Sequence, residues 1–248
     1  MLYGLTSVVR YHGGVLGAID CPLRDPNGAL SFNGAALPSA AIQLTENAFG
    51  IFHFDVPFDP ALKIKLLERF GRPLSQINFE GVTSVFDVAS RCSGQLSQRL
   101  PQNELATIPP VGIIVAGVST SPARRVEVIG LHTHRRTDPN RPFSQLTPFL
   151  GNCYGGNAQI AQFLDAKVFS GFFSREQALR MVYLIYQVSQ RSFQMQQWIG
   201  PGVEVVEVAN GVAFRNVPQD ELETTRKAAT VVHQKLMLSC RRLSGTLL

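Results

Sequence analysis

The chain has 248 residues, of which 45% are apolar and 17% are charged, and its mean hydropathy is +0.06. This composition is typical of a folded globular protein and excludes a disordered chain. The length suits a layered sheet fold, and no linker-like segment divides it, so we expect one domain. The net charge is +5, but the basic residues occur only as scattered pairs such as Arg124-Arg125. No nucleic-acid partner is therefore predicted.

The cysteines and the absence of long apolar runs indicate the compartment. Four cysteines lie far apart, without the pairing that metal sites need, so reduced buried thiols are expected. No apolar run approaches about 18 residues, and the N-terminus lacks a basic segment followed by an apolar core. We predict a cytoplasmic protein with no membrane partner, no metal and no cofactor.

The first quarter of the chain favours β-structure, because short apolar runs alternate with polar stretches rich in glycine, proline and asparagine. Strands are predicted over residues 5–11, 15–21, 40–44 and 49–54.

Two helices are predicted to follow these strands. The first begins at Asp59-Pro60 and ends at Gly71, and its leucines recur at helical spacing. The second covers residues 82–100, with Phe86 among the apolar side chains that face one side.

The next part of the chain returns to strands. Residues 111–132 contain two β-rich segments around a Ser-Thr-Ser-Pro turn, which predicts an antiparallel hairpin. Residues 146–169 predict one strand, a glycine turn and a helix with apolar residues at helical spacing, Phe163 among them.

The last part of the chain predicts two helices around a hairpin. Ser174 and Gln177 form a capping box for a helix that reaches about residue 194. Asn210-Gly211 is a strong hairpin-turn signal, and a final helix is predicted from the residues after Pro218 to about residue 243. The order of elements predicts an α+β protein, a four-layer α-β-β-α sandwich, with residues 1–217 as its main part and 218–248 as a C-terminal helical extension.

Several segments, in this order, resemble the proteasome-type branch of the N-terminal nucleophile hydrolases, over about residues 5–217. The segment GGVLGAID is similar to the family's second strand, which ends in an aspartate, and PPVGIIVAGVS is similar to its central strand. GNCYGGNAQIAQFLD, FSREQALRMVYLIYQVSQRS and GPGVEVVEVANGV are similar to the glycine-rich turn into the third helix, the fourth helix and the closing hairpin. The resemblance implies the four-layer fold, assembly into rings, and hydrolysis by a threonine that self-cleavage exposes.

The resemblance implies Thr6 as nucleophile, with its own amine as base, and Asp20 as the aspartate that orients it. The two residues are fourteen positions apart, where the family usually has sixteen, and shortening both strands by one residue keeps the facing register. Other family residues have no match: no lysine precedes Lys63, residues 151–158 contain no serine, and Ser192 stands where an aspartate is expected. We therefore expect a largely degenerate catalytic set.

Other candidate residues have simpler interpretations. His132 and His134 lie on one face of a strand at a spacing that binds zinc when a third ligand converges, but no such ligand is apparent, so surface histidines are predicted. Cys21 is interpreted as a buried thiol, although a nucleophile is conceivable there. The glycines of residues 151–156 indicate close packing, and the aromatic run from Phe49 to Phe58, which includes His53, indicates core.

The leading hypothesis is a proteasome-like subunit that acts mainly in a ring with copies of itself or related subunits. Two alternatives remain open. One is a self-processing threonine peptidase or amidohydrolase that uses Thr6 on a polypeptide or amide substrate. The other is a small-molecule binding protein that uses the cleft between the sheets. The intact mass separates the leading hypothesis from the threonine enzyme, because loss of residues 1–5 would indicate the enzyme.

Overall fold

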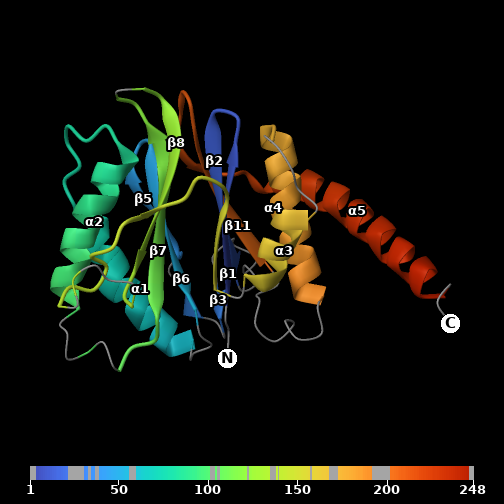
Figure 1. Ribbon diagram of the computed structural model, residues 1–248, viewed down its shortest axis with the longest axis horizontal. Coiled ribbons are helices and arrows are strands. Elements are labelled where there is room, and N and C mark those ends of the chain that lie inside the picture. The colour runs from blue at the N-terminus through green and yellow to red at the C-terminus, as the bar shows by residue number, and fades with distance from the viewer. Residues whose placement is uncertain are drawn as a thin grey trace.

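The computed structural model describes residues 4–21, 31–32, 35–36, 39–55, 60–100, 104, 107–121, 123–134, 138, 140–156, 158–167, 173–191 and 202–245. Two five-stranded antiparallel sheets stack face to face, and helices cover the outer surface of each (Figure 1). None of the helices in these ranges is both long and apolar enough to cross a membrane.

The first sheet contains the first two and the last three of the described strands of the chain. Its strands are β1 (Leu5–Tyr11), β2 (Gly14–Cys21), β10 (Cys153–Gly156), β11 (Gly202–Ala209) and β12 (Val212–Asn216). Their order across the sheet is β10-β1-β2-β11-β12, and every neighbouring pair is antiparallel. The strand β1 has the predicted bounds, and the predicted Asn210-Gly211 turn joins β11 to β12.

The second sheet follows chain order, with all neighbours antiparallel. Its strands are β5 (Ala41–Thr45), β6 (Ala48–Phe54), β7 (Val111–Ser119), β8 (Arg125–His132) and β9 (Thr147–Pro148). A separate pair consists of β3 (Ser31–Phe32) and β4 (Ala35–Ala36). The strand predicted within residues 146–156 is in fact two short strands, β9 and β10, in different sheets, because this segment crosses from one sheet to the other.

The helices form the outer layers. They are α1 (Pro60–Leu74), α2 (Val85–Arg99), α3 (Gln159–Lys167), α4 (Arg175–Arg191) and α5 (Gln219–Gly245). Helices α1 and α2 cover the second sheet, α3 and α4 cover the first, and α5 packs on α4 and extends beyond the body of the protein (Figure 1). The layers are therefore helix, sheet, sheet, helix.

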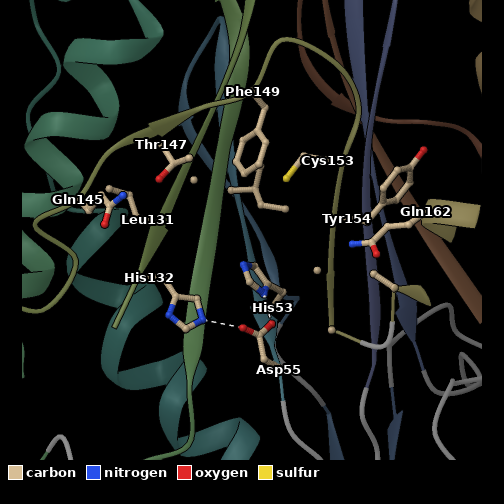
Figure 2. Close-up of a pocket in the computed structure, with 15 residues that line it drawn as sticks. His53, Asp55, Leu131, His132, Gln145, Thr147, Phe149, Cys153, Tyr154 and Gln162 are labelled. Carbon is tan, nitrogen blue, oxygen red and sulfur yellow. Dashed lines mark hydrogen bonds and ion pairs between the residues drawn. The ribbon is translucent and has the colours of Figure 1, made fainter. Parts of the chain in front are cut away.

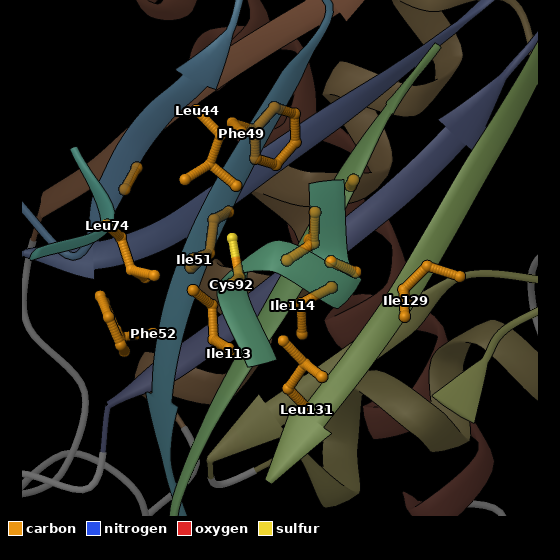
Figure 3. Close-up of a cluster of buried hydrophobic side chains, with 14 of the residues drawn as sticks. Leu44, Phe49, Ile51, Phe52, Leu74, Cys92, Ile113, Ile114, Ile129 and Leu131 are labelled. Atoms are coloured by element: carbon orange, nitrogen blue, oxygen red, sulfur yellow. The ribbon is translucent and has the colours of Figure 1, made fainter. Parts of the chain in front are cut away.

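The apolar interior continues from the space between the sheets to the outer face of the second sheet. Figure 3 shows part of this cluster, in which Phe52 and Ile113 lie near Cys92 of α2. The sheets approach closely at Gly17, where a Cβ atom would lie only 2.4 Å from Ile51 Cδ1. A larger residue at position 17 would therefore push the two sheets apart.

Tertiary packing overrides two of the helix predictions. Helix α1 does not end at Gly71 but continues to Leu74, whose side chain is fully buried. Phe86 was expected in the core but is 47% exposed. Helix α2 begins at Val85 because the Ser84 hydroxyl accepts a hydrogen bond from the backbone N–H of Asp87, 3.0 Å away, and so caps the helix.

The capping box predicted for α4 is confirmed. The Gln177 amide oxygen accepts the backbone N–H of Ser174 at 2.8 Å, and the Ser174 hydroxyl accepts that of Gln177 at 3.2 Å. This reciprocal pair satisfies two backbone donors that would otherwise lack partners at the helix start.

A buried carboxylate joins the layers at this end of the first sheet. The side chain of Glu207, on β11, is 1% exposed and accepts hydrogen bonds from the Tyr11 hydroxyl at 2.5 Å, from Arg175 Nη2 at 2.8 Å and from Arg215 Nη2 at 2.6 Å. Burial raises the pKa of the Glu207 carboxyl, but hydrogen bonds from Arg175, Tyr11 and Arg215 outweigh burial and hold the pKa below its ordinary value. Glu207 thus links β1, β11, β12 and α4.

We predict that Glu207→Gln lowers the free energy of unfolding by about 1.5–3 kcal/mol, because it removes the charge from the hydrogen bonds of Arg175, Arg215 and Tyr11, while the two arginines stay partly solvated. The folded pKa lies below the unfolded value of about 4.3. The stabilisation from ionised Glu207 is therefore complete above that pH and is lost as the pH falls through the folded pKa. Urea unfolding of both proteins between pH 7 and pH 3 measures the loss, and the variant should lack this part of the acid-side slope.

The matched control is Glu223→Gln, because Glu223 pairs with Arg226 on the exposed surface of α5. Its urea midpoint should stay at the wild-type value. Equal midpoints for the two variants would contradict the role given to Glu207.

Candidate functional site

Thr6 lies inside β1 and faces the second sheet. It pairs with Ile19 of β2 and with Gly155 of β10, and it is 3% exposed. Its hydroxyl donates a long hydrogen bond of 3.4 Å to the backbone carbonyl of Phe52. The predicted nucleophile is thus embedded between the two sheets.

Asp20 lies at the end of β2, where it was expected, but it serves a backbone group. Its Oδ1 accepts the N–H of Leu5 at 2.6 Å. Thr6 pairs with Ile19, the neighbour of Asp20, and successive side chains of a strand point to opposite faces. The side chains of Thr6 and Asp20 therefore leave opposite faces of the first sheet, and their catalytic pairing stays a prediction.

The peptide bond between Leu5 and Thr6 is held by the neighbouring strands and by helix α4. Leu5 is fully buried, and its carbonyl oxygen lies 2.7 Å from the Tyr186 hydroxyl of α4, which also lies 2.8 Å from the Ala18 carbonyl. This hydroxyl shares its proton between the two oxygens. Self-cleavage after Leu5 would break a bond that the sheet and α4 both hold in place.

The usual family spacing of sixteen, counted back from Asp20, falls on Gly4. Gly4 has a φ of 71°, a conformation that favours glycine. A Cβ on Gly156, across the strand pair, would lie 2.4 Å from the Gly4 carbonyl oxygen. The backbone at this point is thus packed too closely for a side chain at position 156.

A cluster of titratable side chains lies at one end of the cleft between the sheets. His53 on β6 and His132 on β8 stand on either side of Gly112 in the strand register, with their ring centroids 5.9 Å apart. Asp55 follows β6 and bridges them: its Oδ1 is 3.0 Å from His53 Nδ1 and its Oδ2 is 2.6 Å from His132 Nε2. The sequence interpretation missed this cluster, because it assigned His53 to the core and did not single out Asp55.

The hydrogen bonds assign the protons of this cluster. His132 Nδ1 accepts the backbone N–H of His134 at 3.1 Å, so Nε2 carries the proton and donates to Asp55. Burial raises the pKa of the Asp55 carboxyl, but hydrogen bonds from His132 and His53 outweigh burial and hold it well below its usual range. Asp55 is therefore ionised and accepts a hydrogen bond from the N–H at His53 Nδ1, and the neutral His53 ring then has Nε2 as an acceptor.

The cluster borders a cavity of about 270 Å³. As Figure 2 shows, His53 and Asp55 lie at one end, Phe149 and Cys153 at the other, and Gln145 and Gln162 at the sides. None of the described residues that line the cavity is a lysine or an arginine. The cavity therefore combines an anionic end with an apolar end.

The structure also shows the positions of the histidines and cysteines that the sequence offered as candidates. His132 and His134 have ring centroids 6.0 Å apart, and His134 Nδ1 lies 2.7 Å from the Thr133 hydroxyl. In the ranges that the structure describes, no group of three or more His, Cys, Asp or Glu is placed to hold a metal ion. Cys92 and Cys153 are buried and neither is in a disulfide, as expected of reduced thiols. The side chains of Cys21 and Lys63, and the whole of Ser192, lie outside the described residues.

Comparison with known proteins finds a solved structure of similar fold. No family model matches the sequence, and no curated protein matches it. Among solved structures, Anbu (ancestral beta-subunit) from Yersinia bercovieri is similar, with a TM-score of 0.61 and 12% sequence identity, over 94% of this chain and 96% of that chain. Likeness at this identity extends to the fold and not to the activity. The chain therefore has a proteasome-like fold.

Proposed function

We propose that the chain is a proteasome-like subunit that acts mainly in a ring-type assembly, with copies of itself or related subunits, and whose threonine-type catalytic centre is largely degenerate. The proteasome-like fold supports the first part. The observation that carries the second part is the surroundings of Thr6, which is 3% exposed within a strand whose preceding residue, Leu5, is fully buried.

The partners of Arg10 and Asp20, both described residues, also support degeneracy. Arg10, the cation of β1, lies four residues further along the strand, and its guanidinium binds the backbone carbonyls of Leu150 and Val126. An arginine stays protonated and cannot act as a base. Asp20, the other predicted member of the site, already accepts the Leu5 amide.

Exposed apolar side chains on the outer helices support assembly. Helix α5 has 27 residues, which corresponds to about 40 Å, and its second half extends beyond the body of the protein (Figure 1). Val231 and Leu238, 51% and 55% exposed, are seven residues apart and so lie on one face of α5. Val232 and Phe163 of α3 are also exposed. Exposed apolar side chains on helices are typical of subunit contacts.

We predict that the native mass is a multiple of the 27.2 kDa chain and that Val231→Glu combined with Leu238→Glu lowers it, because two charges would enter the proposed contact. Light scattering during size-exclusion chromatography measures this mass. The control is Val212→Glu at the tip of the β11–β12 hairpin, where the side chain is 37% exposed, and it should keep the wild-type mass. A wild-type protein that elutes as a single chain at high micromolar concentration would refute the assembly role.

The alternative of a self-processing threonine enzyme is tested on the same purified protein. We expect an intact mass that retains residues 1–5, because the bond after Leu5 is held by β1 and Tyr186. The Thr6→Val variant should also retain residues 1–5, and its free energy of unfolding should change by less than about 1 kcal/mol, since the Thr6 hydroxyl makes only a long hydrogen bond. A wild-type mass that begins at Thr6, together with an uncut Thr6→Val variant, would establish the enzyme instead.

A further inference from the structure

The cleft between the sheets holds an ionised carboxylate beside a fixed imidazole acceptor. The Asp55 side chain is 37% exposed, so this carboxylate lies at the edge of the cleft, where solvent reaches it. Asp55 accepts one hydrogen bond at each oxygen, whereas a carboxylate offers about four acceptor sites. The cluster therefore keeps acceptor capacity at the anionic end of the cavity.

Two glycines hold the His53 ring in one position. A Cβ on Gly112 would lie 2.0 Å from His53 Nε2, and a Cβ on Gly155, in the facing sheet, would lie 2.4 Å from His53 Cγ. The ring thus fits only because both neighbours lack side chains. Together with the Nδ1 bond to Asp55, this packing sets the direction of the Nε2 lone pair before any ligand arrives.

The rest of the cavity restricts the size and polarity of an occupant. Phe149 and Cys153 make its far end apolar, as Figure 2 shows. The volume of about 270 Å³ is at the small end of ligand pockets. The described lining holds one carboxylate and neither lysine nor arginine, so it favours a positively charged head group.

We propose that this cavity binds a small organic cation of the alkylamine class. Its ammonium group donates to His53 Nε2 and is attracted by the charge of the Asp55 carboxylate, which bonds the opposite nitrogen of the same ring, and its short alkyl chain packs against Phe149 and Cys153. The site is distinct from the exposed helical face proposed for assembly, so either proposal can fail while the other stands.

The test uses three probes with the same four-carbon chain: butylammonium, butanol and butyrate. Isothermal titration calorimetry of the full chain should give saturable binding of butylammonium that is at least about tenfold tighter than that of butanol, and no binding of butyrate. Asp55→Asn should weaken butylammonium binding by a similar factor. The matched control is Asp165→Asn on α3, a carboxylate that lines a different cavity and accepts the Asn152 amide, and it should bind butylammonium as the wild type does.

A second measurement needs no variant and so does not depend on the folding of Asp55→Asn. Diethyl pyrocarbonate modifies unprotonated imidazole nitrogens, and peptide mapping reports the rate at His53. Butylammonium should slow this modification in the wild-type protein and butanol should not. The proposal is overturned if butylammonium does not saturate in the millimolar range, if butanol binds equally well, or if the rate at His53 is unchanged.

Discussion

The two sheets face each other across an interior with little access to water, so each polar group that enters it needs a partner nearby. Several of these groups have partners that come from distant parts of the chain. The Thr6 hydroxyl reaches the Phe52 carbonyl, the Ser39 hydroxyl donates to Glu204 at 3.0 Å, and the two histidines share Asp55. Thr6, which the family resemblance selects as the reactive residue, is thereby held as part of the sheet. The titratable groups lie instead at the edge of the cleft, where a cavity gives them room.

Much of the fold could be predicted because hydrophobic periodicity follows from burial on one face of each element. The strand β1 and the capping box at Ser174 and Gln177 depend on local sequence, and both were predicted correctly. The end of α1 was not, because the buried side chain of Leu74 outweighs the low helix propensity of Gly71. The exposure of Phe86 depends on how α2 rotates against the sheet, which periodicity alone does not determine.

The site was harder to predict, since it depends on register between strands that are far apart in sequence. His53 and His132 become neighbours because both pair with Gly112 on β7. The distance between them along the sequence does not predict this pairing. His53 also lies in an aromatic strand, where core is the natural interpretation. The separation of Thr6 from Asp20 onto opposite faces depends on a one-residue difference in pairing, which a count of residues along the hairpin cannot resolve.

The crossing from β9 to β10 limits how far the sandwich can open. Pro148 ends a strand of one sheet and Cys153 begins a strand of the other, so five peptide steps of about 3.6 Å, or about 18 Å in all, bound their separation. Packed sheets already lie about 10 Å apart. At the opposite margin the Phe214 amide donates to the Glu46 carbonyl at 2.7 Å and joins the sheets again. The two sheets are thus joined at both margins, by the chain at one and by a hydrogen bond at the other, which limits how far they can separate.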